Sequence, residues 1–156
     1  MSSIINKEWE LIKTVLPQHT DHAGVMWHGS YLNWMEEGRV DALREVGLPY
    51  EELSSNGYEM PVVSMEIKYK LALNHGEEIT LKTWFLPSEG IKLPCKVNFE
   101  KTGGIVAAES MVNLVVVSNK TGKNRLVRSF PNNIKESIYC LQKGPHPKKN
   151  ASYLGN

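Results

Sequence analysis

Residues 18–46 read QHTDHAGVMWHGSYLNWMEEGRVDALREV and change character abruptly near their middle. Up to Ser30 the segment is polar and shows no hydrophobic period. Beyond it, apolar and small residues recur at steps of three and four, which is the spacing of one face of an α-helix. Ser30 is a suitable N-cap, and Gly47 followed by Pro49 is a stop signal. The sequence therefore predicts one long helix, whose buried stripe is Tyr31, Trp34, Met35, Gly38, Ala42 and Val46.

Strand patterns lie on both sides of this helix. A first strand is expected from Trp9 to Val15, and the long alternation of residues 63–73 predicts a strand with one covered face. Residues 105–117 are apolar on both phases, which predicts a central strand buried on both sides. Further short elements are expected at 50–54 (helical), 79–85, 95–99 and 126–127 (strands) and 134–141 (helical). This order predicts an α+β fold, with the helix packed on an antiparallel sheet.

Length and composition limit the class of protein. The chain has 156 residues, 41% of them hydrophobic and 22% charged, which suits one globular domain. We place that domain at residues 1–141 and expect 142–156 to form a flexible tail. The net charge of +1 disfavours a nucleic-acid binder. There is no apolar run of membrane-spanning length and no signal peptide, so we expect a cytoplasmic protein that does not bind a membrane.

The loop before the helix carries the candidate chemistry. The first N–H groups of a helix lack intrahelical acceptors and lie at the positive end of the macrodipole, so they can polarise a carbonyl oxygen. Asp21, a few residues upstream, could attack that carbonyl or activate a water. Gly24 and Gly29 would allow a ligand to approach the backbone closely. The alternative is that Asp21 is only a turn or cap residue and that the glycines serve the turn.

The stretch from Thr20 to Arg39 resembles the signature of the 4-hydroxybenzoyl-CoA thioesterase family, which has the hotdog fold. The matching residues are Asp21, Gly24, the pair Val25-Met26, Trp27, Tyr31, Trp34 and the pair Glu36-Glu37. Residues 60–64, MPVVS, also resemble the family, and the order of predicted strands fits a hotdog fold from about Trp9 to Val127. The resemblance implies one long central helix wrapped by a curved antiparallel β-sheet. Ser30 departs from the family, in which many members have Asn.

The resemblance implies hydrolysis of an acyl-CoA thioester without a cofactor. Asp21 then corresponds to the catalytic aspartate, as nucleophile or general base, and the backbone amide of His28 to the group that polarises the carbonyl. Gly24, Trp27 and Tyr31 are the candidate substrate-binding residues. An aromatic substrate such as 4-hydroxybenzoyl-CoA or 1,4-dihydroxy-2-naphthoyl-CoA is favoured, because Trp27, Trp34 and Tyr31 could stack on a ring, although they could equally be core. Short aliphatic acyl-CoA and acyl carrier protein thioesters stay open as substrates. The family also implies a homo-oligomer, a dimer or tetramer, with sites at subunit interfaces.

Other assignments follow from single residues. His19, His22 and His28 with Asp21 match no closed zinc pattern, so no metal site is expected. Lys92, Lys96, Arg125 and Arg128 are candidates for the CoA phosphates but could be ordinary exposed residues. Two rival functions stay open. One is a non-catalytic acyl-CoA-binding hotdog module, and the other is a hotdog dehydratase that uses the His28 side chain.

Overall fold

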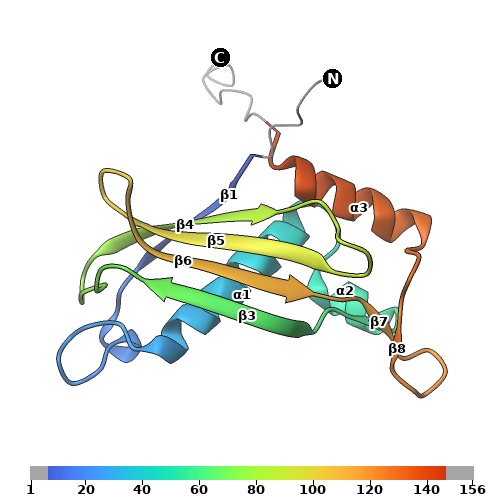
Figure 1. Ribbon diagram of the computed structural model, residues 1–156, viewed down its shortest axis with the longest axis horizontal. Helices are drawn as coiled ribbons and strands as arrows, with labels where there is room; N and C mark the ends of the chain where they lie inside the picture. Colours follow the sequence, from blue (N-terminus) through green and yellow to red (C-terminus); the bar gives the residue numbers. More distant parts are fainter. Residues whose placement is uncertain (1–6, 147–156) are drawn as a thin grey trace, which may run out of the picture.

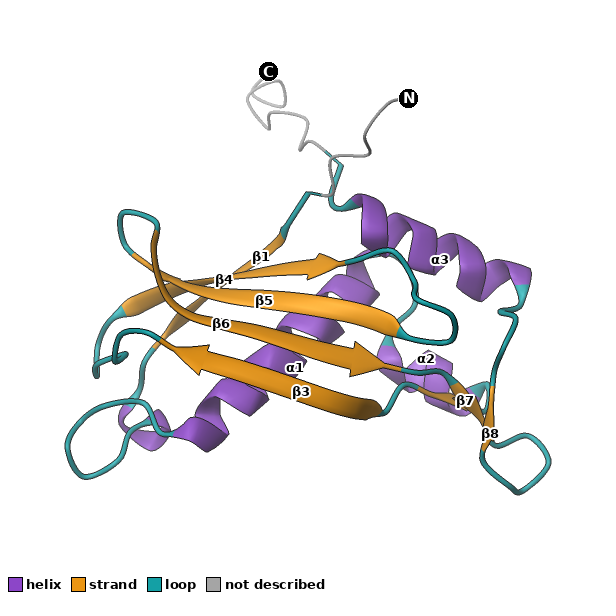
Figure 2. Cartoon of the chain, viewed as in Figure 1, coloured by secondary structure: helices purple, strands orange, loops and turns teal. Residues whose placement is uncertain are grey.

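The computed structural model describes residues 7–146 and has an α+β fold (Figure 1). Most helices and strands overlap the residues that the sequence assigns to them, with shifts at several ends (Figure 2). The strand at 58–59 was not expected, and the expected strand 105–117 is divided between two sheets. In chain order the elements are β1 (Trp9–Thr14), the 3-10 turn η1 (Pro17–His19), α1 (His28–Glu45), α2 (Tyr50–Ser55), β2 (Tyr58–Glu59), β3 (Val62–Tyr69), β4 (Glu78–Phe85), β5 (Leu93–Lys101), β6 (Ile105–Leu114), β7 (Val117–Ser118), β8 (Arg125–Leu126) and α3 (Asn132–Lys143).

A five-stranded antiparallel sheet and the helix α1 form the body of the fold. The strand order is β1-β4-β5-β6-β3, and α1 lies across one face of this sheet (Figure 1). The predicted stripe faces the sheet, since Trp34 and Ala42 are completely buried and Met35 is 1% exposed. Gly38 lets the helix approach β4 closely, because a Cβ there would lie 2.9 Å from Thr83 Oγ1. The expected helix-on-sheet packing is confirmed.

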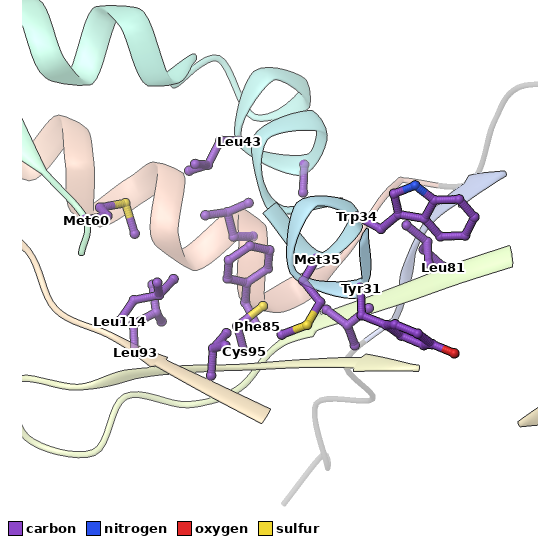
Figure 3. Packing of buried hydrophobic residues seen from close by; sticks show 14 of the residues in the cluster. Tyr31, Trp34, Met35, Leu43, Met60, Leu81, Phe85, Leu93, Cys95 and Leu114 are labelled. Atoms are coloured by element: carbon purple, nitrogen blue, oxygen red, sulfur yellow. The ribbon is translucent and has the colours of Figure 1, made fainter. Parts of the chain in front are cut away.

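The hydrophobic core lies between α1 and the middle strands (Figure 3). The register of β4 with β5 pairs Leu81 with Phe99 and Phe85 with Cys95, and all four side chains are buried. These side chains share the sheet face that α1 covers, because alternate residues of a strand point to the same side.

Two sequence predictions are wrong in detail. Helix α1 begins at His28, three residues before Tyr31, and its N-cap is Trp27 rather than Ser30. The strand most buried on both faces is β5, whereas β6 alternates between buried and half-buried residues. On the outer face of β5, Glu100 is covered because it forms an ion pair with Lys82 of the neighbouring strand (3.3 Å).

Strand β3 is the edge strand on the side of β6, and it differs from the expected half-covered strand. It ends at Tyr69 instead of Leu73, and its apolar phase is largely exposed. Val63 is 52% exposed, Met65 47% and Tyr69 53%. An edge with exposed apolar side chains and free backbone groups is a surface on which another strand can pair.

A small second sheet and α3 complete the fold. The sheet has the order β2-β7-β8, and β2 leads directly into β3. Helix α3 is joined to the large sheet by hydrogen bonds from Trp9 Nε1 to the Leu141 carbonyl (2.9 Å) and from Gln142 Nε2 to the Leu86 carbonyl (3.1 Å). The helix thus includes the first two residues of the predicted tail, while residues 147–156 of that tail lie outside the described residues. Within residues 7–146 no helix is long and apolar enough to cross a membrane.

Candidate active site at the start of helix α1

The loop before α1 is closed by its own hydrogen bonds. The Asp21 N–H donates to the Val25 carbonyl (2.9 Å), and the Gly24 N–H donates to the Asp21 carbonyl (3.1 Å). Asp21 Oδ1 accepts hydrogen bonds from the N–H groups of Ala23 (2.9 Å) and Val25 (3.3 Å). Gly24 has φ +77°, a conformation in which L-residues are strained. The Asp21 carboxylate is exposed, and one of its oxygens holds the turn.

Backbone contacts fix this loop to the sheet and to η1. The Met26 N–H donates to the Leu73 carbonyl (2.7 Å), and the His75 N–H donates to the Gly24 carbonyl (3.0 Å). On the other side, the Trp27 N–H donates to the His19 carbonyl (3.1 Å), which also accepts a hydrogen bond from Ser30 Oγ (3.1 Å). The start of α1 is therefore held beside the segment that follows β3.

Two backbone N–H groups at the start of α1 are free to meet a ligand. His28 and Gly29 occupy the first two helical positions, where a helix supplies no acceptor. Within the described part of the chain neither N–H donates a backbone or side-chain hydrogen bond. Since α1 is 18 residues long, its macrodipole adds partial positive charge at this end. The pair of amides can stabilise an oxyanion.

A pocket of about 270 Å³ opens at this helix start. His28 and Tyr31 line it from α1, and Tyr69 lines it from the end of β3. The Tyr31 ring meets Tyr69 edge-on, with centroids 5.0 Å apart, and packs against Phe99 at the same distance. Burial, with a smaller contribution from the neighbouring Tyr69, raises the pKa of Tyr31 to about 12, so this phenol is neutral at ordinary pH. The complete lining is Val25, Met26, His28, Tyr31, Tyr69, Lys70, Leu71 and Ala72.

The sequence-predicted site residues are distributed over two sides of the helix start. His28 and Tyr31 line the pocket, and Gly24 precedes Val25, which also lines it. Asp21 adjoins the pocket through its hydrogen bonds to Val25 but is not part of the lining in the single chain. Trp27 lies on the other flank, in a groove of about 730 Å³ between α1, β1 and η1.

The aromatic surroundings of the pocket differ from those expected. Trp34 is fully buried on the Trp27 flank, where its ring meets His19 edge-on at 5.3 Å. Tyr69, which sequence reasoning did not select, takes the place expected for a tryptophan near the pocket. A sign of it was present in the sequence, because Tyr69 is an aromatic residue near the end of the long alternating strand.

The described residues contain no group of three or more His, Cys, Asp or Glu side chains placed to hold a metal ion. His19 Nδ1 accepts a hydrogen bond from the Leu16 N–H (3.0 Å), so this nitrogen is engaged within η1. His28 has a different neighbour, since its ring meets Trp27 edge-on at 5.1 Å. The histidines of the loop thus have separate environments.

Residues 15–138 match the Thioesterase-like superfamily, and the chain belongs to this family. A protein of Synechocystis sp. provisionally named as an esterase is 29% identical over 147 residues, covering 91% of this chain and 85% of its own length. A Bacillus subtilis protein provisionally named as the acyl-CoA thioesterase YneP is 28% identical over 113 residues, covering 72% and 82%. The DHNA-CoA thioesterase of Staphylococcus aureus superposes with a TM-score of 0.75 at 22% identity, over 85% of this chain and 89% of its own.

These findings confirm the hotdog fold and the thioesterase class. The protein is a hydrolase that acts on thioester bonds. This result favours the thioesterase over the non-catalytic module and the dehydratase that the sequence left open.

Proposed function

We propose that this protein hydrolyses acyl-CoA thioesters at the pocket where α1 begins. The observation that carries the proposal is the unpaired His28 N–H, on a residue that lines a pocket with one buried and one exposed tyrosine, followed in the helix by the unpaired Gly29 N–H. A thioester carbonyl placed at these amides would be polarised, and the negative charge of the tetrahedral intermediate would be stabilised there. The relative named as an acyl-CoA thioesterase supports CoA as the thiol.

The carboxylate of Asp21 supplies the attack in this proposal. As a nucleophile it would add to the carbonyl carbon, expel the CoA thiolate and leave a mixed anhydride for water to cleave. As a general base it would take a proton from a water that attacks the same carbon. Its exposure and its hydrogen bonds to the pocket wall at Val25 support either role.

We favour an aromatic acyl group, of the 4-hydroxybenzoyl or 1,4-dihydroxy-2-naphthoyl kind. Tyr31 and Tyr69 present ring surfaces to the pocket, and aromatic rings prefer edge-to-face or offset contacts with one another. The structural likeness to a DHNA-CoA thioesterase is in keeping with this choice.

Asp21→Asn tests the catalytic role with little change in structure. The amide oxygen of Asn can still accept the hydrogen bonds of Ala23 and Val25, so the loop should persist. We expect thiol release from a panel of aromatic and aliphatic acyl-CoAs to fall by orders of magnitude while the melting temperature stays the same. Unchanged turnover would remove Asp21 from the mechanism, and an inactive wild type on every thioester would refute the function. The exposed thiol of Cys140 should be replaced by Ser in both proteins, because thiol reagents would label it.

The protein would act as a dimer formed through the β3 edge. Two antiparallel copies of β3 can pair so that Ile67 faces Ile67 of the partner subunit on the two-fold axis. This register brings Glu66 opposite the partner's Lys68 and Met65 opposite the partner's Tyr69, so opposite charges and apolar side chains meet. Shifting the register by one pair in either direction would oppose two Glu66 or two Lys68 side chains. The exposed apolar phase of β3 is the surface that the dimer would cover.

A cross-linking experiment tests this dimer. Ile67→Cys in a Cys140→Ser background should form an intersubunit disulfide on mild oxidation, because facing residues of an antiparallel pair have neighbouring Cβ atoms. Ile12→Cys, at an exposed position on the opposite edge strand β1, is the matched control and should stay unlinked. A monomer in sedimentation, or equal cross-linking of both variants, would contradict the β3 dimer.

A further inference from the structure

The carbonyl oxygen of His19 joins two residues that lie on either side of the candidate oxyanion amides. It accepts a hydrogen bond from the Trp27 N–H (3.1 Å) and another from Ser30 Oγ (3.1 Å). Trp27 is the N-cap of α1, and Ser30 is the third residue of the helix. The two residues that carry the amides, His28 and Gly29, therefore lie between the two donors. We call this pair of hydrogen bonds to the His19 carbonyl the first-turn clamp.

The acceptor of the clamp is anchored in the body of the protein. His19 Nδ1 accepts a hydrogen bond from the Leu16 N–H (3.0 Å), which fixes the imidazole within η1. The edge of the same ring meets Trp34, which is completely buried, at 5.3 Å. On the helix side, Ser30 is only 2% exposed. A displacement of the His19 carbonyl would therefore disturb both η1 and a side chain of the core.

The clamp and the pocket lie on different flanks of the helix start. His19, Trp27 and Ser30 line the groove of about 730 Å³ between α1, β1 and η1. Within residues 7–146 none of these three residues lines the pocket that contains His28 and Tyr31. The clamp therefore does not touch an acyl group in this pocket, and any effect on the reaction has to pass through the backbone of α1.

The first turn of a helix needs such support, because its N–H groups lack intrahelical acceptors and helix ends fray. An oxyanion donor is effective only when it already points at the position where negative charge develops. A backbone amide has no rotamer of its own, so its direction is set by the chain on both sides. Catalytic groups have to be held to within about 0.5 Å of the productive geometry.

We infer that Ser30 and His19 are positioning residues of the thioester hydrolysis. They hold the first turn of α1 so that the N–H groups of His28 and Gly29 point at the substrate carbonyl. The inference rests on the proposed function and adds to it the device that keeps the two amides aimed. A clamp that only stabilised the fold would leave kcat unchanged in a folded variant.

A matched pair of variants at Ser30 tests the inference. Ser30→Thr keeps the hydroxyl, whereas Ser30→Val replaces it with a methyl group in a side chain of the same shape. We expect kcat of Ser30→Val to be about three- to tenfold below that of Ser30→Thr, the factor that corresponds to one neutral hydrogen bond, at unchanged KM. Equal kcat values, or a change confined to KM, would overturn the inference.

Ser30→Ala provides the same comparison with the wild type and needs no extra space at this buried position. It should lose kcat by the same factor as Ser30→Val. Asn33→Ala, at an exposed residue of α1 that lines the same groove, is the control and should keep the wild-type kcat. A Ser30→Ala protein with the wild-type kcat would refute the role of the hydroxyl.

Infrared spectroscopy measures the aim of the amides directly. In a ketone analogue of the acyl-CoA a methylene separates the sulfur from the carbonyl, so the analogue cannot be hydrolysed as a thioester. Hydrogen bonds to its oxygen lower the C=O stretching frequency. The bound ketone should therefore absorb at a higher frequency in Ser30→Ala than in the wild type, and Ser30→Thr should restore the wild-type value. The same frequency in all three proteins would show that the clamp does not aim the amides.

Substitutions at His19 test the anchor of the clamp. In His19→Asn the side-chain oxygen can accept the hydrogen bond of the Leu16 N–H, whereas His19→Ala has no acceptor there. His19→Ala should lose more kcat than His19→Asn. The double variant His19→Ala/Ser30→Ala should lose less than the product of the two single losses, because both residues act through one carbonyl. A strictly multiplicative loss would contradict this common route.

Failure of the proposed function would be recognised separately. If the wild type released no thiol from any thioester, the hydrolysis itself would be refuted. The NMR signals of the His28 and Gly29 amides in the free protein would still decide on the clamp: they should shift in Ser30→Ala and return in Ser30→Thr. Unshifted signals in Ser30→Ala would refute the clamp and leave an active thioesterase intact.

Discussion

The ring of Tyr31 meets the ring of Tyr69 edge-on, with an interplanar angle of 89° and centroids 5.0 Å apart. One ring is almost completely buried in the core, and the other is half exposed at the end of an edge strand. Tyr69 is thereby held by a fixed neighbour while one side of its ring faces the pocket. A rigid aromatic wall beside the free amides of α1 is the feature that should select the acyl group.

Removal of this wall should reduce the preference for aromatic substrates. Tyr69→Ala should lower kcat/KM for a benzoyl thioester relative to a butyryl thioester by between about twofold and tenfold, which is the range of an aromatic pair. Tyr69→Phe should retain the preference. Tyr139→Ala, at an exposed tyrosine of α3 outside the lining of this pocket, serves as the control. An unchanged ratio in Tyr69→Ala would exclude this ring from substrate selection.

The role of the His28 amide can be separated from that of its side chain. His28→Pro deletes the N–H at the first helical position, where proline is well tolerated, and Trp27 already has the extended conformation (φ −83°, ψ 155°) that precedes proline. We expect a loss in kcat of about a hundredfold, typical for an oxyanion donor, with the helix content preserved in circular dichroism. His28→Ala should remain active. If the alanine variant is as impaired as the proline variant, the imidazole takes part in the reaction.

The effect of a substitution at Gly29 on the free energy of unfolding should depend on the Trp27 ring. A Cβ on Gly29 would overlap the six-membered ring of Trp27, which lies across the first turn of α1. In a Trp27→Ala background, Gly29→Ala should raise the free energy of unfolding by up to about 1 kcal/mol, because alanine favours the helix. With Trp27 present the gain should be smaller, since the ring must move out. Urea denaturation of the four proteins measures this coupling, and strictly additive effects would show that the ring does not rest on Gly29.

Stability should fall at high pH through two buried acids. Burial raises the pKa of Cys95 to about 12, and burial together with Tyr69 raises the pKa of Tyr31 to about 12. The unfolded chain releases these protons near pH 8.5 and 10, as ordinary thiols and phenols do. Between these pH values and pH 12 the folded state therefore holds protons that the unfolded state has lost. The free energy of unfolding keeps its full value below this range and decreases as the pH rises towards 12.

Urea unfolding at pH 8 and pH 11 measures this loss. Tyr31→Phe and Cys95→Val each remove one titrating group, so each should lose less stability between the two pH values than the wild type. Tyr139→Phe, at an exposed tyrosine of α3, should behave like the wild type. A loss of the same size in all four proteins would show that Tyr31 and Cys95 do not cause the fall in stability at high pH.

Much of the fold could be predicted because hydrophobic periods are local. The stripe of α1 and the alternation of β4 follow directly from the spacing of their residues. The start of α1 could not be predicted, because Ser30 has the side chain of an N-cap but donates its hydroxyl to the His19 carbonyl. Ser30 is instead the third residue of the helix and bonds a residue eleven positions earlier, a contact that side-chain preference at one position does not reveal.

The composition of the candidate site was less accessible from the sequence. Asp21, His28 and Tyr31 could be selected because they belong to one continuous stretch. Tyr69 could not, because its place beside Tyr31 depends on the direction of β3 and its register with β6, where Tyr69 pairs with Ala108. The sequence likewise placed Trp27 with Tyr31, whereas the turn of the helix puts the two side chains on different flanks.

The net charge of the chain conceals an uneven distribution of charge along the sequence. Since the whole chain carries +1 and residues 115–131 carry +4, the other 139 residues together carry −3. Lys120, Lys123, Arg125 and Arg128 are exposed at or near the small sheet, where positive charge attracts polyanions. Such a molecule orients a charged substrate before contact, and its encounter rate with that substrate falls as ionic strength rises. A small protein with a net charge near zero can therefore still attract and orient a charged substrate.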